Sequence, residues 1–379
     1  MDDSLRPHLP PEIIYLILSR LPVKSLCRFK CVCLKWKSLI SSPKFLKTHL
    51  HINKSQNQKA LLISHGSDDL YAVDLACANP TAEKLCSVPA EQFGASRGRV
   101  LVSPCDGGLV FVHGESFEFS LLLNPFTSEF KRLPKTPFSD SDLDEGFKET
   151  VVCGLGYDSC TDDYKVLIVQ VVNSEGAVYS LRTDAWRRIQ FEYDTNLASQ
   201  FGVYLNNRLH WLCLHGVGED RDIHVAAFDF SDEIFRKIRL PNGLFDNSHM
   251  VILRGCLGLI HFMDTMYTID VWVMNEYGVT ESWTRISISN PMLHVDHVLC
   301  LLPEDVFVLS TYERDIHRIH RSQLFLYNPE KAKEKAMIVP GIPTIFTFLG
   351  NSVETLVSPY HGGEIMGQCE ASSSGSGSP

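Results

Sequence analysis

The chain has 379 residues, 44% of them hydrophobic, and a formal net charge of −10 at pH 7. This length allows one large domain or two ordinary ones with a sizeable apolar core. The first four residues include no basic region before an apolar run, and no segment approaches the roughly 18 apolar residues of a membrane span. We therefore expect no membrane segment and a location in the cytoplasm, the nucleus or both.

Apolar residues recur at helical spacing in the first 50 positions. The segment Pro10-Pro11-Glu12 is typical of a helix start, and Pro22 ends the pattern that follows. A second pattern runs over residues 26–40, and Ser42-Pro43 begins a short third helix. Three helices of this size carry more Ile, Leu, Phe and Trp than they can bury among themselves, which predicts a docking surface.

The spaced positions include Leu9-Pro10, Leu21-Pro22, Trp36 and Leu39-Ile40-Ser41. With the neighbouring motifs, they resemble the F-box of plant F-box proteins. The resemblance implies docking on a Skp1-type adaptor and, through it, on the cullin and RING subunits of a ubiquitin ligase. The alternative is that Leu26, Phe29 and Trp36 are only the core of a small helical domain. The matching motifs are Leu9-Pro10-Pro11-Glu12-Ile13-Ile14, Leu21-Pro22-Val23-Lys24-Ser25-Leu26, Arg28-Phe29-Lys30-Cys31-Val32-Cys33, Trp36 and Pro43-Lys44-Phe45. The implied adaptor contacts are Leu9, Pro10, Ile13, Ile14, Leu21, Pro22, Leu26, Val32 and Trp36.

Basic residues are concentrated at this end of the chain. Residues 1–67 contain 11 Lys+Arg and 3 Asp+Glu, a net charge of +8, so the totals of 35 and 45 leave 24 and 42, or −18, for the rest. A basic module attracts acidic proteins or nucleic acid. The F-box resemblance favours a protein, because Skp1-type adaptors are acidic as a family and no nucleic-acid reading motif accompanies the basic residues. A solvated face without a charged partner is the remaining alternative.

Downstream of residue 60 the sequence repeats. An aromatic residue, two mostly basic positions and an aliphatic residue recur at intervals of 56, 49 and 48 residues, each after short strand-like segments. A period near 50 with about four strands a unit is typical of a β-propeller. Residues 60–90 supply an incomplete unit, and we expect strands at 345–348 and 353–357 to complete it and close a ring of about six blades. The repeated motifs are Phe130-Lys131-Arg132-Leu133, Trp186-Arg187-Arg188-Ile189, Phe235-Arg236-Lys237-Ile238 and Trp283-Thr284-Arg285-Ile286.

The repeat region contains characteristic short segments such as Gly156-Tyr157-Asp158, Tyr277-Gly278 and Glu281-Ser282-Trp283. In these it resembles the F-box-associated interaction domain of plant proteins, including regulators of immune-receptor turnover and proteins encoded at self-incompatibility loci. A kelch repeat is less well supported, since only Gly107-Gly108 provides the expected double glycine. The resemblance implies binding of a protein substrate, whose identity no motif indicates. The supporting segments are Gly156-Tyr157-Asp158, Asp163-Tyr164-Lys165-Val166, His210-Trp211, Phe228-Asp229, Asp270-Val271-Trp272-Val273-Met274 and Leu356-Val357-Ser358-Pro359.

Residues suited to catalysis or metal binding are few. Two histidine pairs are spaced three apart, so their side chains would face opposite sides of a strand. Cysteines 27, 31 and 33 lack further ligands at suitable spacing, and we expect the twelve cysteines to be free thiols. No hydrolase, phosphate-binding or zinc-protease motif is present, so we expect no enzyme activity and no cofactor. The histidine pairs are His294 with His297 and His317 with His320.

Together these patterns predict an N-terminal all-α F-box of three helices followed by an all-β propeller of about six four-stranded blades. The expected boundaries are 1–52 for the F-box, 53–59 for a linker, 60–360 for the propeller and 361–379 for a disordered Ser/Gly-rich tail. The predicted function is substrate recognition in an SCF (Skp1-cullin-F-box) ubiquitin ligase, with no nucleic-acid or membrane partner. The alternatives are a stand-alone propeller that binds a ligand and a metal-dependent propeller enzyme.

Overall fold

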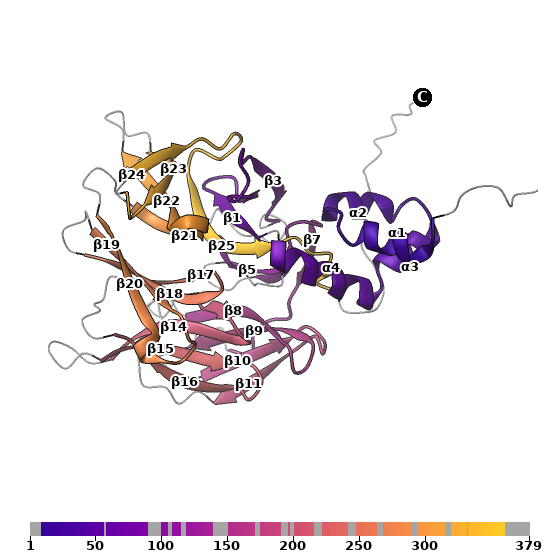
Figure 1. Cartoon of the computed structure of the whole chain (residues 1–379). Coiled ribbons are helices and arrows are strands. Elements are labelled where there is room, and N and C mark those ends of the chain that lie inside the picture. Colours follow the sequence, from indigo (N-terminus) through magenta and orange to yellow (C-terminus); the bar gives the residue numbers. More distant parts are fainter. Residues whose placement is uncertain are drawn as a thin grey trace, which may run out of the picture.

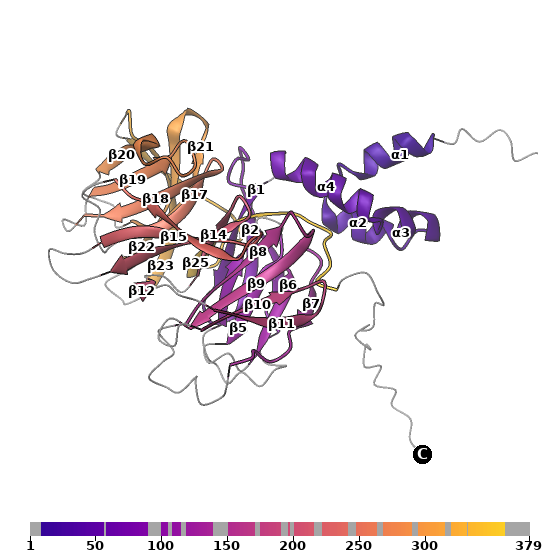
Figure 2. The same ribbon diagram turned by 90° about the horizontal axis from the view of Figure 1, so that it is seen from below.

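The computed structural model shows a helical unit beside a ring of six β-sheets (Figure 1, Figure 2). It describes residues 9–56, 58–89, 100–104, 108–114, 119–138, 151–170, 175–190, 196–197, 201–215, 222–241, 248–263, 268–289, 295–314, 320–331 and 333–360. The expected tail after residue 360, His294 and His317 lie outside these residues. None of the described helices is long and apolar enough to cross a membrane.

Four helices, rather than the three expected, form the helical unit (residues 9–56). The second expected helix is two helices, because the backbone at Cys33 is extended, with φ −160° and ψ 162°. Its Sγ accepts a hydrogen bond from the Trp36 backbone N–H at 3.5 Å, and so caps the next helix. The apolar spacing continues across this break, so periodicity alone does not reveal it. The helices are α1 (Pro11–Leu18), α2 (Val23–Phe29), α3 (Leu34–Ile40) and α4 (Pro43–Gln56).

Six antiparallel sheets form the blades of a propeller, which confirms the predicted fold class. The blades contain β25 with β1–β3, β4–β7, β8–β11, β12–β16, β17–β20 and β21–β24. Two single-turn helices, Thr280–Ser282 and Pro303–Asp305, lie between strands. The strands are β1 (Gln58–Ser64), β2 (Asp69–Val73), β3 (Ala82–Ser87), β4 (Val100–Pro104), β5 (Val110–Gly114), β6 (Ser120–Asn124), β7 (Glu129–Arg132), β8 (Val151–Asp158), β9 (Asp163–Gln170), β10 (Glu175–Ser180), β11 (Ala185–Gln190), β12 (Asn196–Leu197), β13 (Val203–Leu205), β14 (Arg208–His215), β15 (Asp222–Asp229), β16 (Ile234–Arg239), β17 (Ser248–Leu253), β18 (Cys256–Phe262), β19 (Thr268–Met274), β20 (Trp283–Ser289), β21 (Val295–Leu302), β22 (Val306–Arg314), β23 (His320–Asn328), β24 (Lys333–Met337) and β25 (Phe346–Val353).

The apolar core of the propeller lies between neighbouring blades. Each of six buried clusters combines side chains from two adjacent sheets, such as Phe111 of β5 with Val166 of β9. The aromatic residues of the repeated motif help to join blades. Trp186 Nε1 donates to the Pro134 carbonyl of the preceding blade at 2.9 Å, and Trp283 Nε1 donates to the Arg239 carbonyl at 3.3 Å. The tryptophans are therefore blade-packing residues, as expected.

The two ends of the propeller sequence share one blade. Strand β25 pairs with β1, so the last strand completes the blade that the first three begin, and this closes the ring. The second strand expected at 353–357 is absent, because the chain leaves the sheet after Val353 and crosses to the helical unit. This crossing segment positions the two parts of the molecule.

The linker expected at 53–59 is corrected by the structure. Helix α4 continues to Gln56 and β1 begins at Gln58, so the segment is the end of a helix and the start of a strand. Asn53 is only 4% exposed, since it lies against the propeller. Polar composition suggested a connection, but Asn53 and Lys59 contact Glu354 at the junction between the two parts.

Candidate functional site

Large apolar side chains are exposed on the helical unit. Six of the ten exposed large hydrophobic residues in the described part of the chain belong to it, although it covers only residues 9–56. Their exposed fractions range from 42% for Ile13 to 83% for Leu34. Such a concentration on one small unit favours an interaction site, because soluble domains rarely expose large apolar surfaces without a partner. The six residues, which we call the apolar surface, are Leu9, Ile13, Leu16, Ile17, Val32 and Leu34.

Helix α1 is apolar on two sides. On its inner side Leu18 is buried, and Tyr15 donates its hydroxyl to Thr48 Oγ1 at 2.8 Å. The Tyr15 ring also meets the ring of Phe45 edge-on, with 5.4 Å between the ring centroids. Its outer side carries three residues at i, i+3, i+4 spacing, which places them on one face. A partner can therefore cover that face without disturbing the inner packing. The outer residues are Ile13, Leu16 and Ile17.

The nine sequence-predicted contact residues differ in exposure. Leu26 is 0% exposed in the centre of the helical core, and its role as an adaptor contact stays a prediction. Its physical role is to hold the helices together. Trp36 packs edge-on against Phe29, with 5.3 Å between the ring centroids, and keeps part of its surface free. The exposed members are Leu9, Pro10, Ile13, Pro22 and Val32, and the half-buried ones are Ile14, Leu21 and Trp36.

Three members of the apolar surface were not predicted as contacts. Leu16 and Ile17 extend the outward face of α1, and their spacing from Ile13 was a signal for this second face. Leu34 follows the break between α2 and α3, which the sequence pattern did not show. Periodicity identified an apolar band that was too wide to be buried, but not which edge of it faces solvent.

Basic side chains lie on the same unit as the apolar surface. Two lysines form ion pairs with the propeller: Lys24 with Glu83 at 2.9 Å and Lys47 with Asp162 at 2.5 Å. Both pairs are about half exposed, so they contribute little to stability. No acidic residue occurs from position 13 to position 67, so the unit can attract an acidic partner. Other exposed basic residues are Arg20, Arg28, Lys35, Lys37 and Lys44.

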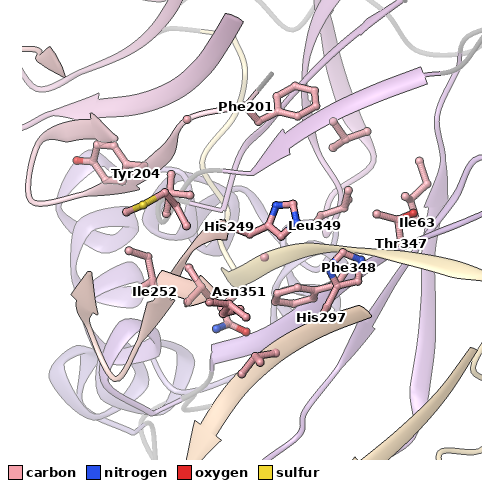
Figure 3. A pocket seen from close by; sticks show the side chains of 18 of the residues that line it. Ile63, Phe201, Tyr204, His249, Ile252, His297, Thr347, Phe348, Leu349 and Asn351 are labelled. Atoms are coloured by element: carbon pink, nitrogen blue, oxygen red, sulfur yellow. The ribbon is translucent and has the colours of Figure 1, made fainter. Parts of the chain in front are cut away.

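The inner strands of the propeller enclose a cavity of about 770 Å³ (Figure 3). His249 of β17 and His297 of β21 point into it beside Phe348 of β25. Burial lowers the pKa of His297 to about 4, with the neighbouring His249 adding to the shift, and burial also lowers the pKa of His249. Both imidazoles are therefore neutral at pH 7. Within the described ranges, no group of three His, Cys, Asp or Glu side chains could hold a metal ion.

The helical unit and the histidines lie at opposite ends of the propeller axis. Helix α4 enters the ring at β1, and the chain returns to the helices where β25 ends. His249 and His297 lie near the beginnings of β17 and β21, which like β25 are inner strands. Inner strands of a propeller run in the same direction, so the histidines are at the face away from the helices. Among the described residues, the helices contact the propeller at Glu83, at Asp162 and through the segment after Val353, all toward the other face.

The sequence matches known domains over both parts of this architecture. Residues 65–341 match the F-box associated beta propeller domain, and residues 7–48 match the F-box domain. The chain belongs to the F-box-associated propeller family. Its helical unit is the F-box, which an F-box-associated propeller follows.

Two relatives from Arabidopsis thaliana show the extent of the similarity. The chain is 31% identical to F-box protein CPR1 over 312 residues, which cover 73% of this chain and 72% of the relative. It is 33% identical to F-box/kelch-repeat protein At3g23880 over 352 residues, which cover 86% and 91% of the two chains. F-boxes in general bind Skp1-type adaptors, and an attached propeller points to a protein substrate and to a receptor rather than an enzyme.

Proposed function

We propose that this protein is the substrate-recognition subunit of an SCF ubiquitin ligase. The F-box binds a Skp1-type adaptor, which connects it to the cullin and RING subunits, and the propeller binds a protein substrate. The observation that carries this proposal is the apolar surface of the F-box. Its side chains are exposed although the unit packs a buried core behind them, to which Leu356 of the propeller chain contributes.

The apolar surface supplies part of the free energy that a specific complex needs. Burying a Leu, Ile or Val side chain contributes about 2 kcal/mol, so covering a half-exposed one contributes about 1 kcal/mol. Six such residues would contribute about 6 kcal/mol before the cost of association. A micromolar complex has a net binding free energy of about 8 kcal/mol, so further contacts must add to the apolar surface and offset the cost of association. The basic side chains would raise the association rate constant for an acidic adaptor and would orient the adaptor on the F-box.

The proposed mechanism is catalysis by proximity. The receptor needs no nucleophile or general base, because an associated E2 enzyme performs the transfer to a substrate lysine. The receptor raises the local concentration of that lysine near the E2 enzyme. This requires the substrate-binding face to be accessible while the F-box is occupied, and the face away from the helices meets that requirement.

The adaptor interaction can be tested with the full-length chain and a purified plant Skp1-type protein. We expect a dissociation constant at or below about 1 μM by titration calorimetry. The double substitution Leu9→Ala with Pro10→Ala should weaken binding at least about tenfold, since both residues are exposed. The matched control is Ile338→Ala, at an 85% exposed site on the propeller, which should leave binding unchanged. Absence of binding at tens of micromolar would remove the ligase assignment.

The localisation remains part of the proposal. An SCF receptor would act in the cytoplasm, the nucleus or both. Imaging of a fluorescent fusion in plant cells, with a sequence-scrambled F-box as the comparison, would test it. Accumulation only in a secretory compartment would contradict both the localisation and the ligase role.

A further inference from the structure

The chain that follows the ring-closing strand becomes part of the F-box. Residues 354–357, which we call the strap, leave β25 and run between the propeller and the helices (Figure 2). Nothing in the propeller requires this course, since β25 has already completed the ring at Val353. The strap therefore has a role other than closing the blade.

One side chain of the strap completes the helical core. Leu356 is 3% exposed and packs in the buried cluster of the F-box. Phe126, from the turn between β6 and β7, is partly buried against the same cluster. A unit of about 50 residues has little apolar core to lose, so one added leucine is a large fraction of it. The other buried members of the cluster are Leu18, Val23, Leu26, Ile40 and Phe45.

A second side chain of the strap caps a helix of the F-box. The Glu354 carboxylate accepts a hydrogen bond from the Val23 backbone N–H at 3.1 Å, at the first residue of α2. The N-cap of α2 is Pro22, whose side chain can make no such bond. The same carboxylate pairs with Lys59, and both side chains are at most 20% exposed. The Glu354 carbonyl also accepts a hydrogen bond from Asn53 Nδ2 at 3.1 Å, and this bond links the strap to α4.

The propeller holds the strap from the other side. Asn124 is fully buried at the end of β6, and its Nδ2 donates to the carbonyls of Thr355 and Val357 at 2.9 and 2.8 Å. Gly108 approaches so closely that a Cβ there would lie 2.4 Å from Thr355 Cγ2. The strap is thus fixed by one blade while its side chains enter the F-box.

We propose that Glu354 and Leu356 are positioning residues of the F-box, so that a stable adaptor-docking surface forms only when the strap is in place. The relevance to an adaptor rests on the proposed function above, whereas the completion of the F-box by the strap does not. A receptor that lacks the strap would keep an intact ring and a substrate-binding face. It would have an F-box with an open core and an uncapped α2, and would join the ligase poorly.

The decisive experiment compares two truncations of the chain by hydrogen exchange. A chain ending at Val353 retains β25 but lacks the strap, and a chain ending at Tyr360 retains both. The reporter is the Leu26 amide in α2, which donates to the Pro22 carbonyl at 3.1 Å. In the shorter chain we expect this amide to exchange about 100-fold faster or more, while amides of the blades change by less than about threefold. The longer chain should match the full-length protein.

If the shorter chain fails to fold as a whole, point variants test whether the strap protects α2. Leu356→Ala should speed exchange at Leu26 about 100-fold, because it opens a cavity in the small core. Glu354→Ala should speed it about fivefold through loss of the cap, while Glu354→Gln, which keeps an acceptor oxygen, should restore most of the protection. The matched control is Leu309→Ala, at an equally buried site between two blades, which should leave α2 protected.

The outcomes separate this inference from the proposed function. If α2 stays as protected in the shorter chain or in Leu356→Ala as in the full-length protein, the strap is not a positioning element and the inference is overturned. If protection falls but the full-length chain binds no Skp1-type adaptor, the ligase role fails while the strap still completes the F-box. If both hold, the shorter chain should also bind the adaptor at least about tenfold more weakly.

Discussion

Replacing Leu26 by alanine should lower the stability of the F-box, whereas replacing Ile17 by alanine should weaken adaptor binding and leave stability nearly unchanged. Leu26 is 0% exposed, so Leu26→Ala removes buried methyl groups and leaves a cavity, and we expect the F-box to lose about 3 kcal/mol of stability. Ile17 is 48% exposed on the outer side of α1, so Ile17→Ala should change stability by less than about 0.5 kcal/mol. It should weaken adaptor binding by about 1 kcal/mol, which is about fivefold.

The measurements for this pair are hydrogen exchange in α2 for stability and titration calorimetry for binding. Ile234→Ala is the control for exposure, because Ile234 is 53% exposed on β16 of the propeller and should affect neither quantity. Two results would contradict these expectations. One is unchanged hydrogen-exchange protection of α2 in Leu26→Ala, and the other is adaptor binding by Ile17→Ala that is as tight as in the unaltered chain. The first result would mean that Leu26 is not a core residue, and the second that α1 does not face the adaptor.

Three further predictions concern the propeller. Burial lowers the pKa of His210 from 6.5 to about 4, so the folded state favours the neutral imidazole. The stability that the neutral imidazole contributes is present above pH 6.5 and is lost as the pH falls toward 4. His210→Gln should therefore flatten the urea-midpoint profile between pH 6.5 and pH 4. Gly108→Ala should lower the melting temperature more than Gly66→Ala, because both have positive φ but only the first would place a Cβ against neighbouring atoms. Lys165→Met should cost about 3 kcal/mol in urea unfolding, since it leaves the fully buried Asp158 carboxylate without its charged partner at 2.8 Å; an unchanged midpoint would contradict this.

Much of the fold could be predicted because local signals repeat along the chain. The motif at Phe130, Trp186, Phe235 and Trp283 recurs with the blade period, and each copy lies in an outermost strand that packs on its neighbour. The expected closure at the ends was correct for the same reason, since unpaired strands at both ends had to find partners. The helix count was wrong because the extended residue Cys33 interrupts a pattern that remains apolar on both sides.

The candidate site was predicted only in part. Spacing showed that the F-box has a wide apolar band, but it could not rank Leu26 below Leu16 as a surface residue. Which side of a helix is buried depends on what packs against it, and that information is not local. The central cavity had no sequence signal either, because its lining comes from strands of different blades.

The amino-acid sequence by itself determined the two-part architecture and the repeating four-stranded blade, and it predicted about six blades and a docking helix face. These features follow from hydrophobic periodicity and turn chemistry, which act over a few residues. Only the tertiary structure decided that Leu356 and Glu354 belong to the F-box, more than 300 residues from the helices they support. The physical reason is that ring closure brings the end of β25 beside α2, and no local pattern records which distant segments a closed ring places together.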